Sequence, residues 1–119
     1  MAFDWAEFLA FSERLYARAD RDEATERTII SRAYYSAFGI ARTQLGDRVA
    51  GRQSIHKKVI DTYKNSDDRN ERQLGSKLDS LRLRRVKADY ETNYTPENNT
   101  ERALQEARGI LRQLGEFSL

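Results

Sequence analysis

Apolar residues in this chain recur at every third or fourth position, and this periodicity restricts the fold to packed helices. Between Asp22 and Gly46, the apolar side chains that fall within about 100° of arc on a helical wheel are Ile30, Tyr34, Ala37, Phe38, Ala41 and Leu45. Asp20 and Asp22 can cap the start of this helix, and Gly46 can end it. No segment alternates convincingly with a period of two, so the pattern predicts helices throughout.

Two further helices flank this one. Before it, Asp4 and Glu7 have the spacing of a capping box for a helix whose apolar stripe holds Trp5, Phe8, Leu9 and Leu15. After it, residues 46–53 are expected to form a loop. Ser54 can then cap a short helix that carries Ile55, Val59 and Tyr63.

Two more helices complete the chain. The fourth is expected to run from about Asn70 to the low nineties. Thr95 and Pro96 either cap the last helix directly or form a turn that delays its start to Thr100. The last helix carries Leu104, Ala107, Leu111 and Leu114, with Gly115 behind them. Five helices joined by short loops predict a single all-α domain over residues 1–119, an antiparallel up-and-down bundle of four to five helices.

The fourth helix has an arginine in the middle of its apolar face. That face is formed by Leu74, Leu78, Leu81 and Ala88. Arg85 lies about 20° from Leu74 on the same wheel. A guanidinium keeps its charge at any ordinary pH, so burying Arg85 requires a carboxylate partner, a polar cavity or an anionic ligand.

The same helix has a second apolar line on roughly the opposite side, formed by Leu83, Val86 and Tyr90. Basic charge is also concentrated here: residues 69–87 sum to +5, whereas the whole chain carries +2. A solvated, salt-bridged helix face is a common explanation of such a run. That explanation does not account for Arg85.

Composition excludes several classes of site. The 119 residues include no cysteine, which rules out disulfides and thiolate metal sites, and one histidine, His56, which argues against a site needing several imidazoles. No apolar run approaches the ~20 residues of a membrane span. The acidic residues near the N-terminus are unlike a targeting peptide. We therefore expect a soluble, cytoplasmic protein with no metal, no cofactor and no membrane contact.

Four short motifs follow one another along the chain: Ser-Arg-Ala-Tyr-Tyr-Ser-Ala-Phe at residues 31–38, Ser-Ile-His at 54–56, Leu-Gly at 74–75, and Leu-Arg followed by Arg85 and Ala-Asp-Tyr within 81–90. Together they resemble the HEPN domain family (higher eukaryote and prokaryote nucleotide-binding), in its small stand-alone prokaryotic branch. The resemblance covers roughly residues 5–115. It implies a four-to-five-helix bundle, usually dimeric and often paired with a minimal nucleotidyltransferase in a toxin–antitoxin or defence module.

Many members of that family are metal-independent RNases whose site is an arginine followed four to six residues later by a histidine. In this chain Ala88 and Asp89 take the histidine position, and no histidine follows. Arg52 and His56 lie on a different helix and are a poor substitute. The difference matters because a histidine exchanges protons near neutral pH, whereas an arginine supplies only charge.

Three functions remain open. In the first, a homodimer formed through the fourth helix places arginines around a cationic cleft that binds RNA, a nucleotide phosphate or an acidic partner protein; the binding candidates are Arg82, Arg84, Arg85, Tyr35 and Arg42. In the second, the protein is an RNase toxin whose catalytic candidates are Arg82, Arg85, Asp89 and Tyr90. In the third, Arg85 forms an internal ion pair with Asp89, and the protein is a structural dimerisation module.

Overall fold

The computed structural model describes residues 2–49 and 54–116, and within them the protein is all helical. The helices are α1 (Ala6–Tyr16), α2 (Glu23–Leu45), α3 (Ile55–Lys64), α4 (Arg69–Tyr90) and α5 (Thr100–Gln113). Short 3-10 turns, η1 (Gly46–Arg48) and η2 (Pro96–Asn98), follow α2 and precede α5. The predicted all-α bundle is therefore confirmed. None of the helices in these ranges is long and apolar enough to cross a membrane.

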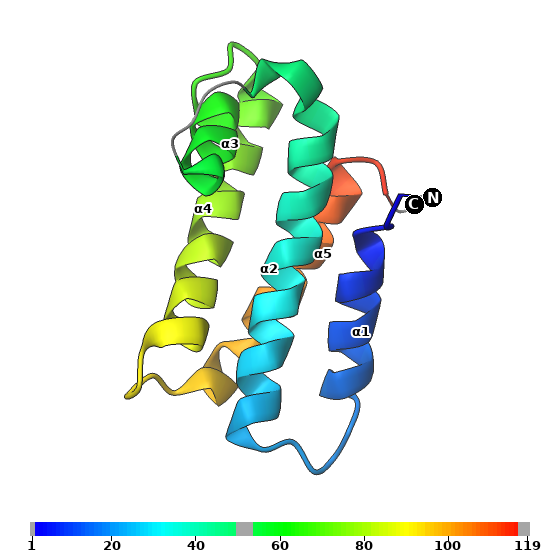
Figure 1. The fold of residues 1–119 in the computed structure, drawn as a ribbon, viewed down its shortest axis with the longest axis vertical. Coiled ribbons are helices and arrows are strands. Elements are labelled where there is room, and N and C mark those ends of the chain that lie inside the picture. Colours follow the sequence, from blue (N-terminus) through cyan, green and yellow to red (C-terminus); the bar gives the residue numbers. More distant parts are fainter. Residues whose placement is uncertain (1, 50–53, 117–119) are drawn as a thin grey trace.

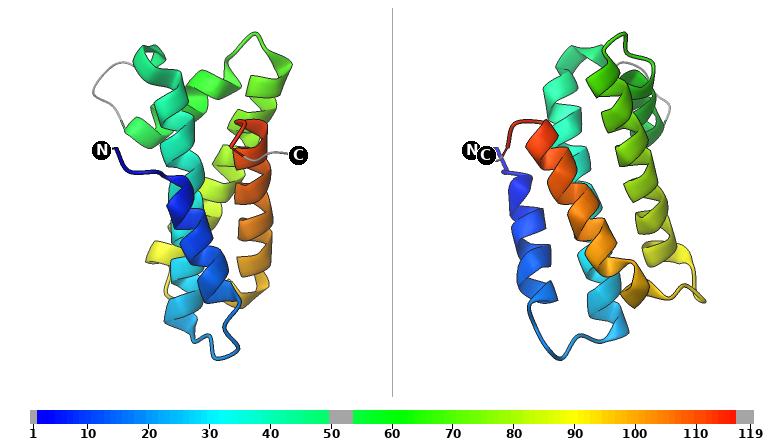
Figure 2. Two further views of the ribbon diagram at one scale, coloured as in Figure 1. Left: turned by 90° about the vertical axis from the view of Figure 1, so that its right-hand side faces the viewer. Right: turned by 180° about the vertical axis from the view of Figure 1, so that it is seen from behind.

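Four helices form the body of the molecule, and α3 lies against its side (Figure 1). In chain order α1, α2, α4 and α5 alternate in direction, as an up-and-down bundle requires (Figures 1 and 2). Helix α2 packs against α1, α4 and α5, and α3 packs mainly against α4. Side chains of α2 therefore contribute to every part of the core. On the face of α2 that is turned toward α3, they contact both α3 and α4.

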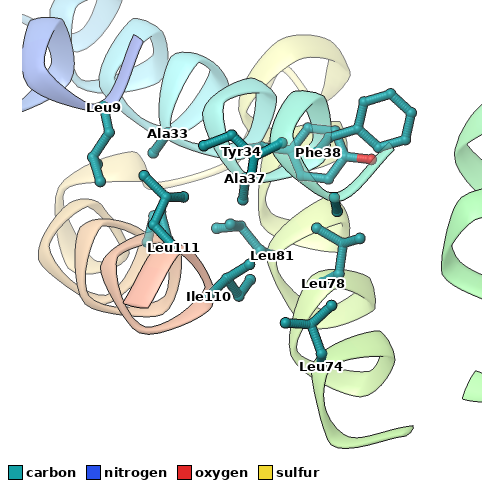
Figure 3. Packing of buried hydrophobic residues seen from close by; sticks show 14 of the residues in the cluster. Leu9, Ala33, Tyr34, Ala37, Phe38, Leu74, Leu78, Leu81, Ile110 and Leu111 are labelled. Atoms are coloured by element: carbon teal, nitrogen blue, oxygen red, sulfur yellow. The ribbon is translucent and has the colours of Figure 1, made fainter. Parts of the chain in front are cut away.

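The core lies between α2, α4 and α5 (Figure 3). The predicted stripe of α2 is buried there, and Ile30, Tyr34 and Ala37 are fully enclosed. On α4 the predicted face is also buried, with Leu74, Leu78, Leu81 and Ala88 at 2% exposure or less. A fully buried leucine or isoleucine contributes about 1.5–3 kcal/mol. Such a core is strong enough to hold a few polar groups that are not fully satisfied.

Most helix ends follow the sequence. The Asp22 carboxylate accepts a hydrogen bond from the Thr25 N–H at 2.8 Å, and Gly46 ends α2 with a positive φ of 53°. Helix α5 starts at Thr100, so the later of the two predicted starts is the observed one. At the N-terminus the Asp4 carboxylate accepts from the N–H of Ala6 at 3.0 Å rather than closing a capping box, and α1 begins at Ala6.

Helix α3 is held tightly against α4 at its C-terminal end. A Cβ atom at Gly75 would fall 2.7 Å from the backbone nitrogen of Lys64, so only glycine allows this approach. The Lys64 ammonium pairs with Asp79 of α4 at 2.7 Å. The other end of α3 lies near Arg82, because Ser54 and Lys57 border one hollow with it. Helix α3 therefore runs antiparallel to α4 and carries His56 toward the arginines.

Candidate nucleic-acid interface

Arg85 lies mostly buried on the inner face of α4, the face on which its place on the helical wheel puts it. Its side chain is 12% exposed, and its Nε atom lies 2.8 Å from Oδ2 of Asp89, one turn later. The N–H is not aligned with that oxygen, so the buried Nε donates no hydrogen bond to any described residue. The Asp89 carboxylate thus offsets the charge of Arg85 at one edge of the guanidinium, while the Nε–H donor of Arg85 is not satisfied.

Aromatic rings hold the Arg85 guanidinium in place. Its Cζ atom lies 4.9 Å from the ring centre of Tyr35, 5.5 Å from that of Tyr90 and 5.9 Å from that of Tyr34. These distances lie within the range of cation–π attraction, about 6 Å. Tyr34 and Tyr35 come from α2, so the arginine is positioned by a neighbouring helix as well as by its own.

Two further arginines adjoin this one. Arg82, one turn earlier on α4, also has a buried Nε that donates to no described residue. Arg32 of α2 lies 4.8 Å from the Tyr35 ring centre and donates a hydrogen bond to Ser31 Oγ at 3.1 Å. Among the ion pairs between described residues, Asp89 is the only carboxylate that contacts any of these three arginines. Positive charge therefore predominates locally.

His56 lies beside the arginines, although 29 positions separate it from Arg85 in the sequence. Its Nδ1 is 2.6 Å from the hydroxyl of Tyr34, and its ring stacks on Phe38 with centres 4.3 Å apart. Burial lowers the pKa of His56 below its ordinary value, and the positive charges of Arg85, Arg82 and Arg42 lower it further. The imidazole is therefore neutral at pH 7.

Tyr34 fixes the orientation of this imidazole. Burial raises the pKa of Tyr34 well above its ordinary value, with the nearby arginines acting in the opposite direction, so its hydroxyl stays protonated. When the hydroxyl donates to Nδ1, Nε2 carries the ring proton and can donate to a ligand. In the other tautomer, Nε2 is unprotonated and can accept a proton. We refer to Arg32, Tyr34, Tyr35, His56, Arg82 and Arg85 as the arginine–tyrosine cluster.

The structure brings together five of the residues selected from the sequence: Tyr35, Arg82, Arg85, Asp89 and Tyr90. Asp89 holds Arg85 and also accepts a hydrogen bond from Ser31 at 3.3 Å.

Two other selected arginines lie apart from the cluster. Arg42 is exposed two turns beyond Tyr35 on α2, where both border one hollow. Arg84 points to the other side of α4, where it pairs with Glu106 at 2.7 Å and donates to Asn99 at 2.6 Å. Arg84 is therefore held by the protein itself and does not join the others. Arg52 lies outside the described residues.

His56, Tyr34 and Arg32 were not selected from the sequence. A signal for His56 was present, because residues 56, 59, 60 and 63 are spaced as one helical face and the last three are buried. His56 therefore had to point toward the bundle. Which residues it meets there depends on how α3 packs, and no local sequence pattern indicates that packing.

The outer side of α4 is apolar and open to solvent. Leu83 is 54% exposed and Tyr90 71% exposed, with Val86 half-buried between them.

No cluster of acidic or histidine side chains suited to a metal ion occurs within residues 2–49 and 54–116. Comparisons with protein families, with curated proteins and with solved structures found no match to this chain.

Proposed function

We propose that the arginine–tyrosine cluster binds phosphate groups of RNA or of a nucleotide. The observation that carries this proposal is that the buried Nε–H groups of Arg82 and Arg85 make no aligned hydrogen bond with a described residue, although Asp89 Oδ2 lies 2.8 Å from Nε of Arg85. An unsatisfied buried donor costs about 1–3 kcal/mol. A phosphate oxygen is a strong acceptor for guanidinium groups, and a shift of the arginine side chains that brings these donors to a bound phosphate would recover that cost.

The surroundings favour a nucleic acid over an acidic protein. Tyr35 is half-buried between two arginines, with Arg32 and Arg85 at 4.8 and 4.9 Å from its ring centre. Rings and guanidinium planes of this kind stack on bases, each contact contributing about 1–3 kcal/mol. A carboxylate of a partner protein would use the arginines but not the aromatic surface.

The same proposal includes the assembly implied by the HEPN resemblance. The apolar line of Leu83, Val86 and Tyr90, with Leu83 and Tyr90 exposed and Val86 half-buried, supports a homodimer formed through α4, because apolar side chains open to solvent on one face are typical of an interface. Tyr90 also contacts Arg85, so a second copy on this face would lie next to the cluster. A nucleotidyltransferase encoded as a partner, in a toxin–antitoxin or defence module, completes the proposal.

Binding of a labelled single-stranded RNA of about ten nucleotides, measured by fluorescence anisotropy, tests the proposal. Arg85→Met is expected to weaken binding at least about tenfold, the effect of losing one charge-assisted hydrogen bond. Arg84→Met is the matched control, since it removes the same charge from the adjacent position of α4, where Glu106 already holds the guanidinium. Equal weakening by both variants would reduce the proposal to unspecific charge attraction, and unchanged binding in Arg85→Met would overturn it.

A second candidate is metal-independent RNA cleavage, favoured by the position of His56 beside Arg82 and Arg85. A neutral imidazole with unprotonated Nε2 can take the proton of a ribose 2′-hydroxyl while that oxygen attacks the phosphorus to form a 2′,3′-cyclic phosphate. The 5′-oxygen leaves and takes a proton from solvent water. Arg82 and Arg85 would stabilise the charge that develops on the phosphate. Cleavage in the presence of a chelator, abolished in His56→Gln while RNA binding persists, is the expected result. No cleavage by the wild-type protein would remove this candidate.

A further inference from the structure

A hollow of about 580 Å³ opens beside the arginine–tyrosine cluster, on the side of Tyr35 and His56. It is bordered by α2, the start of α3 and the residue before α1; its lining includes Trp5, Tyr35, Phe38, Arg42, Thr43 and His56. Its volume is that of a typical small-ligand site, about 300–1,000 Å³. We propose that this Trp5 hollow receives the base of the nucleotide whose phosphate the cluster binds. The inference rests on the proposed function.

One wall of the hollow is a tryptophan set directly against the backbone of α2. A Cβ atom at Gly39 would fall 2.2 Å from the Trp5 ring, so the ring takes the place of a side chain there. Phe3 and Phe8 support Trp5, with ring centres 5.2 and 5.8 Å away. The tryptophan is therefore held on several sides and presents its remaining surface to the hollow.

The other walls combine aromatic faces with two polar groups. His56 stacks on Phe38 and is oriented by Tyr34, which leaves Nε2 as its one polar ring atom without a partner among the described residues. Arg42 makes no ion pair with a described residue, so its five donors remain available to a ligand. Thr43 uses its hydroxyl proton on the Gly39 carbonyl at 2.7 Å. Aromatic walls with a few polar groups suit a base, which presents two faces and a polar edge.

Tyr35 joins the hollow to the cluster. Its ring centre lies 4.9 Å from Cζ of Arg85 and 5.8 Å from the ring centre of His56, and Tyr35 also lines the hollow. The Tyr35 side chain thus lies between the arginines and the aromatic walls of the hollow. A single nucleotide can span this separation. Since a paired base could not enter, the ligand is a mononucleotide or a single-stranded RNA, not a duplex.

The fluorescence of Trp5 reports directly on this hollow, because it is the only tryptophan in the chain. The full-length protein is titrated with adenosine 5′-monophosphate and with ribose 5-phosphate, with correction for absorbance, and affinities are measured by calorimetry. The nucleotide is expected to quench Trp5 saturably and to bind at least tenfold more tightly than ribose 5-phosphate. The sugar phosphate should bind without quenching.

A filled hollow provides the second arm. Thr43→Phe adds a ring to the hollow from an exposed position on α2 and should weaken the nucleotide at least tenfold while leaving ribose 5-phosphate unaffected. The matched control is Thr28→Phe, because Thr28 is also exposed on α2 and makes the same bond to the carbonyl four residues earlier.

The possible failures are distinguishable. Equal affinities for the two ligands with unchanged Trp5 fluorescence would place the base outside the hollow, overturning this inference while phosphate binding stands. Loss of nucleotide binding in Thr28→Phe as well as Thr43→Phe would also overturn it. Absence of binding by both ligands and by single-stranded RNA would overturn the inference together with the proposed function.

Discussion

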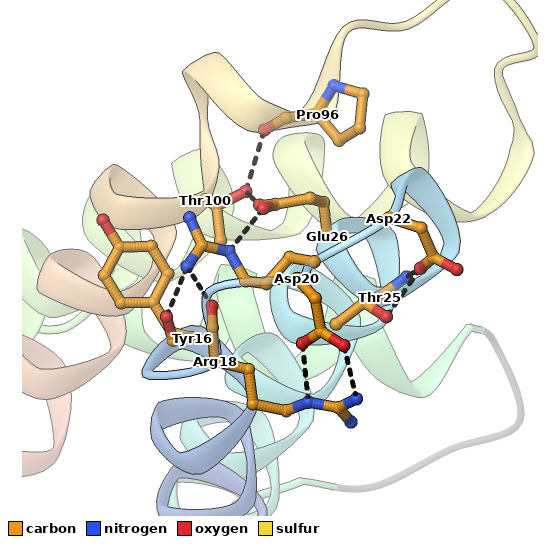
Figure 4. Close-up of polar contacts among 9 residues, drawn as sticks. Tyr16, Arg18, Asp20, Asp22, Thr25, Glu26, Pro96 and Thr100 are labelled. Atoms are coloured by element: carbon orange, nitrogen blue, oxygen red, sulfur yellow. Dashed lines mark hydrogen bonds and ion pairs between the residues drawn. The ribbon is translucent and has the colours of Figure 1, made fainter.

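Two regions of the molecule each hold an arginine against an aromatic ring and a carboxylate, and they differ in how completely the arginine is satisfied. At the first, near the α1–α2 connection, Arg21 donates from Nε to Glu26 at 2.5 Å and from a terminal nitrogen to the carbonyls of Tyr16 and Arg18. Thr100 of α5 contacts the other Glu26 oxygen, and also the Pro96 carbonyl (Figure 4).

At the second region, Arg85 has one carboxylate at its edge and three tyrosine rings around it, and its Nε–H makes no aligned hydrogen bond with a described residue. The first region links α1, α2 and α5 through hydrogen bonds that the chain provides itself, as structural arginines do. The second is rigidly positioned but still has donors to offer. An arginine held by several hydrogen bonds within the protein stabilises the fold, whereas a positioned arginine with unused donors is suited to a ligand.

The largest expected effect lies in the first region. Glu26→Ala leaves Arg21 without its carboxylate and removes one of the two acceptors of the Thr100 hydroxyl. Because breaking a buried ion pair leaves an uncompensated charge, the free energy of unfolding should fall by about 3 kcal/mol. Guanidinium chloride unfolding followed by circular dichroism measures this change. A loss below about 1 kcal/mol would show that the Arg21 network is not structural, and the comparison would fail.

The next prediction compares the stability effects of replacing two adjacent arginines of α4. Arg84→Met should lower the free energy of unfolding by about 1–3 kcal/mol, since Glu106 and Asn99 lose their partner. Arg85→Met should change it by less than about 1 kcal/mol, because the methionine fills similar volume and removes an unsatisfied donor. Its ion-pair partner Asp89 is exposed, so water solvates the carboxylate that is left. The same unfolding measurement applies. A larger loss in Arg85→Met than in Arg84→Met would assign Arg85 a structural role, as the internal ion-pair hypothesis requires.

A smaller effect is expected at the carboxylate that competes with the ligand. Asp89→Asn keeps the shape of the side chain and removes the negative charge 2.8 Å from Arg85. RNA affinity should rise by about threefold to tenfold in anisotropy titrations, and its decrease with added salt should become steeper. Weaker binding in Asp89→Asn would instead mean that Asp89 is needed to orient Arg85 for the ligand.

The smallest effect concerns acid stability. Because the pKa of His56 is lowered in the fold, the unfolded chain takes up this proton first as the pH falls toward and below 6.5. The contribution of His56 therefore reduces stability on acidification. Between pH 7.5 and 5, wild-type protein should lose more unfolding free energy than His56→Gln, with all other groups common to both. Identical pH profiles would contradict the position of His56 beside the arginines.

The helices could be predicted from the sequence because apolar spacing, caps and glycine stops are local signals. Gly46 and Asp22 act as expected, and Arg85 lies on the buried face that its position indicated. The composition of the cluster could be predicted only in part. The contact of Tyr34 with His56 depends on how α3 packs on α4, and the pairing of Arg84 with Glu106 depends on how α5 packs on α4. No local sequence pattern encodes either packing.

The most direct test of the account is nuclear magnetic resonance of the arginine Nε–H groups during titration with single-stranded RNA. If phosphate accepts hydrogen bonds from Arg82 and Arg85, the Nε–H resonances of these two residues should shift saturably. The Nε–H group of Arg21 already donates to Glu26, so its resonance should not shift. Unchanged Arg82 and Arg85 resonances at saturating RNA would contradict the claim that unsatisfied arginines form the binding site.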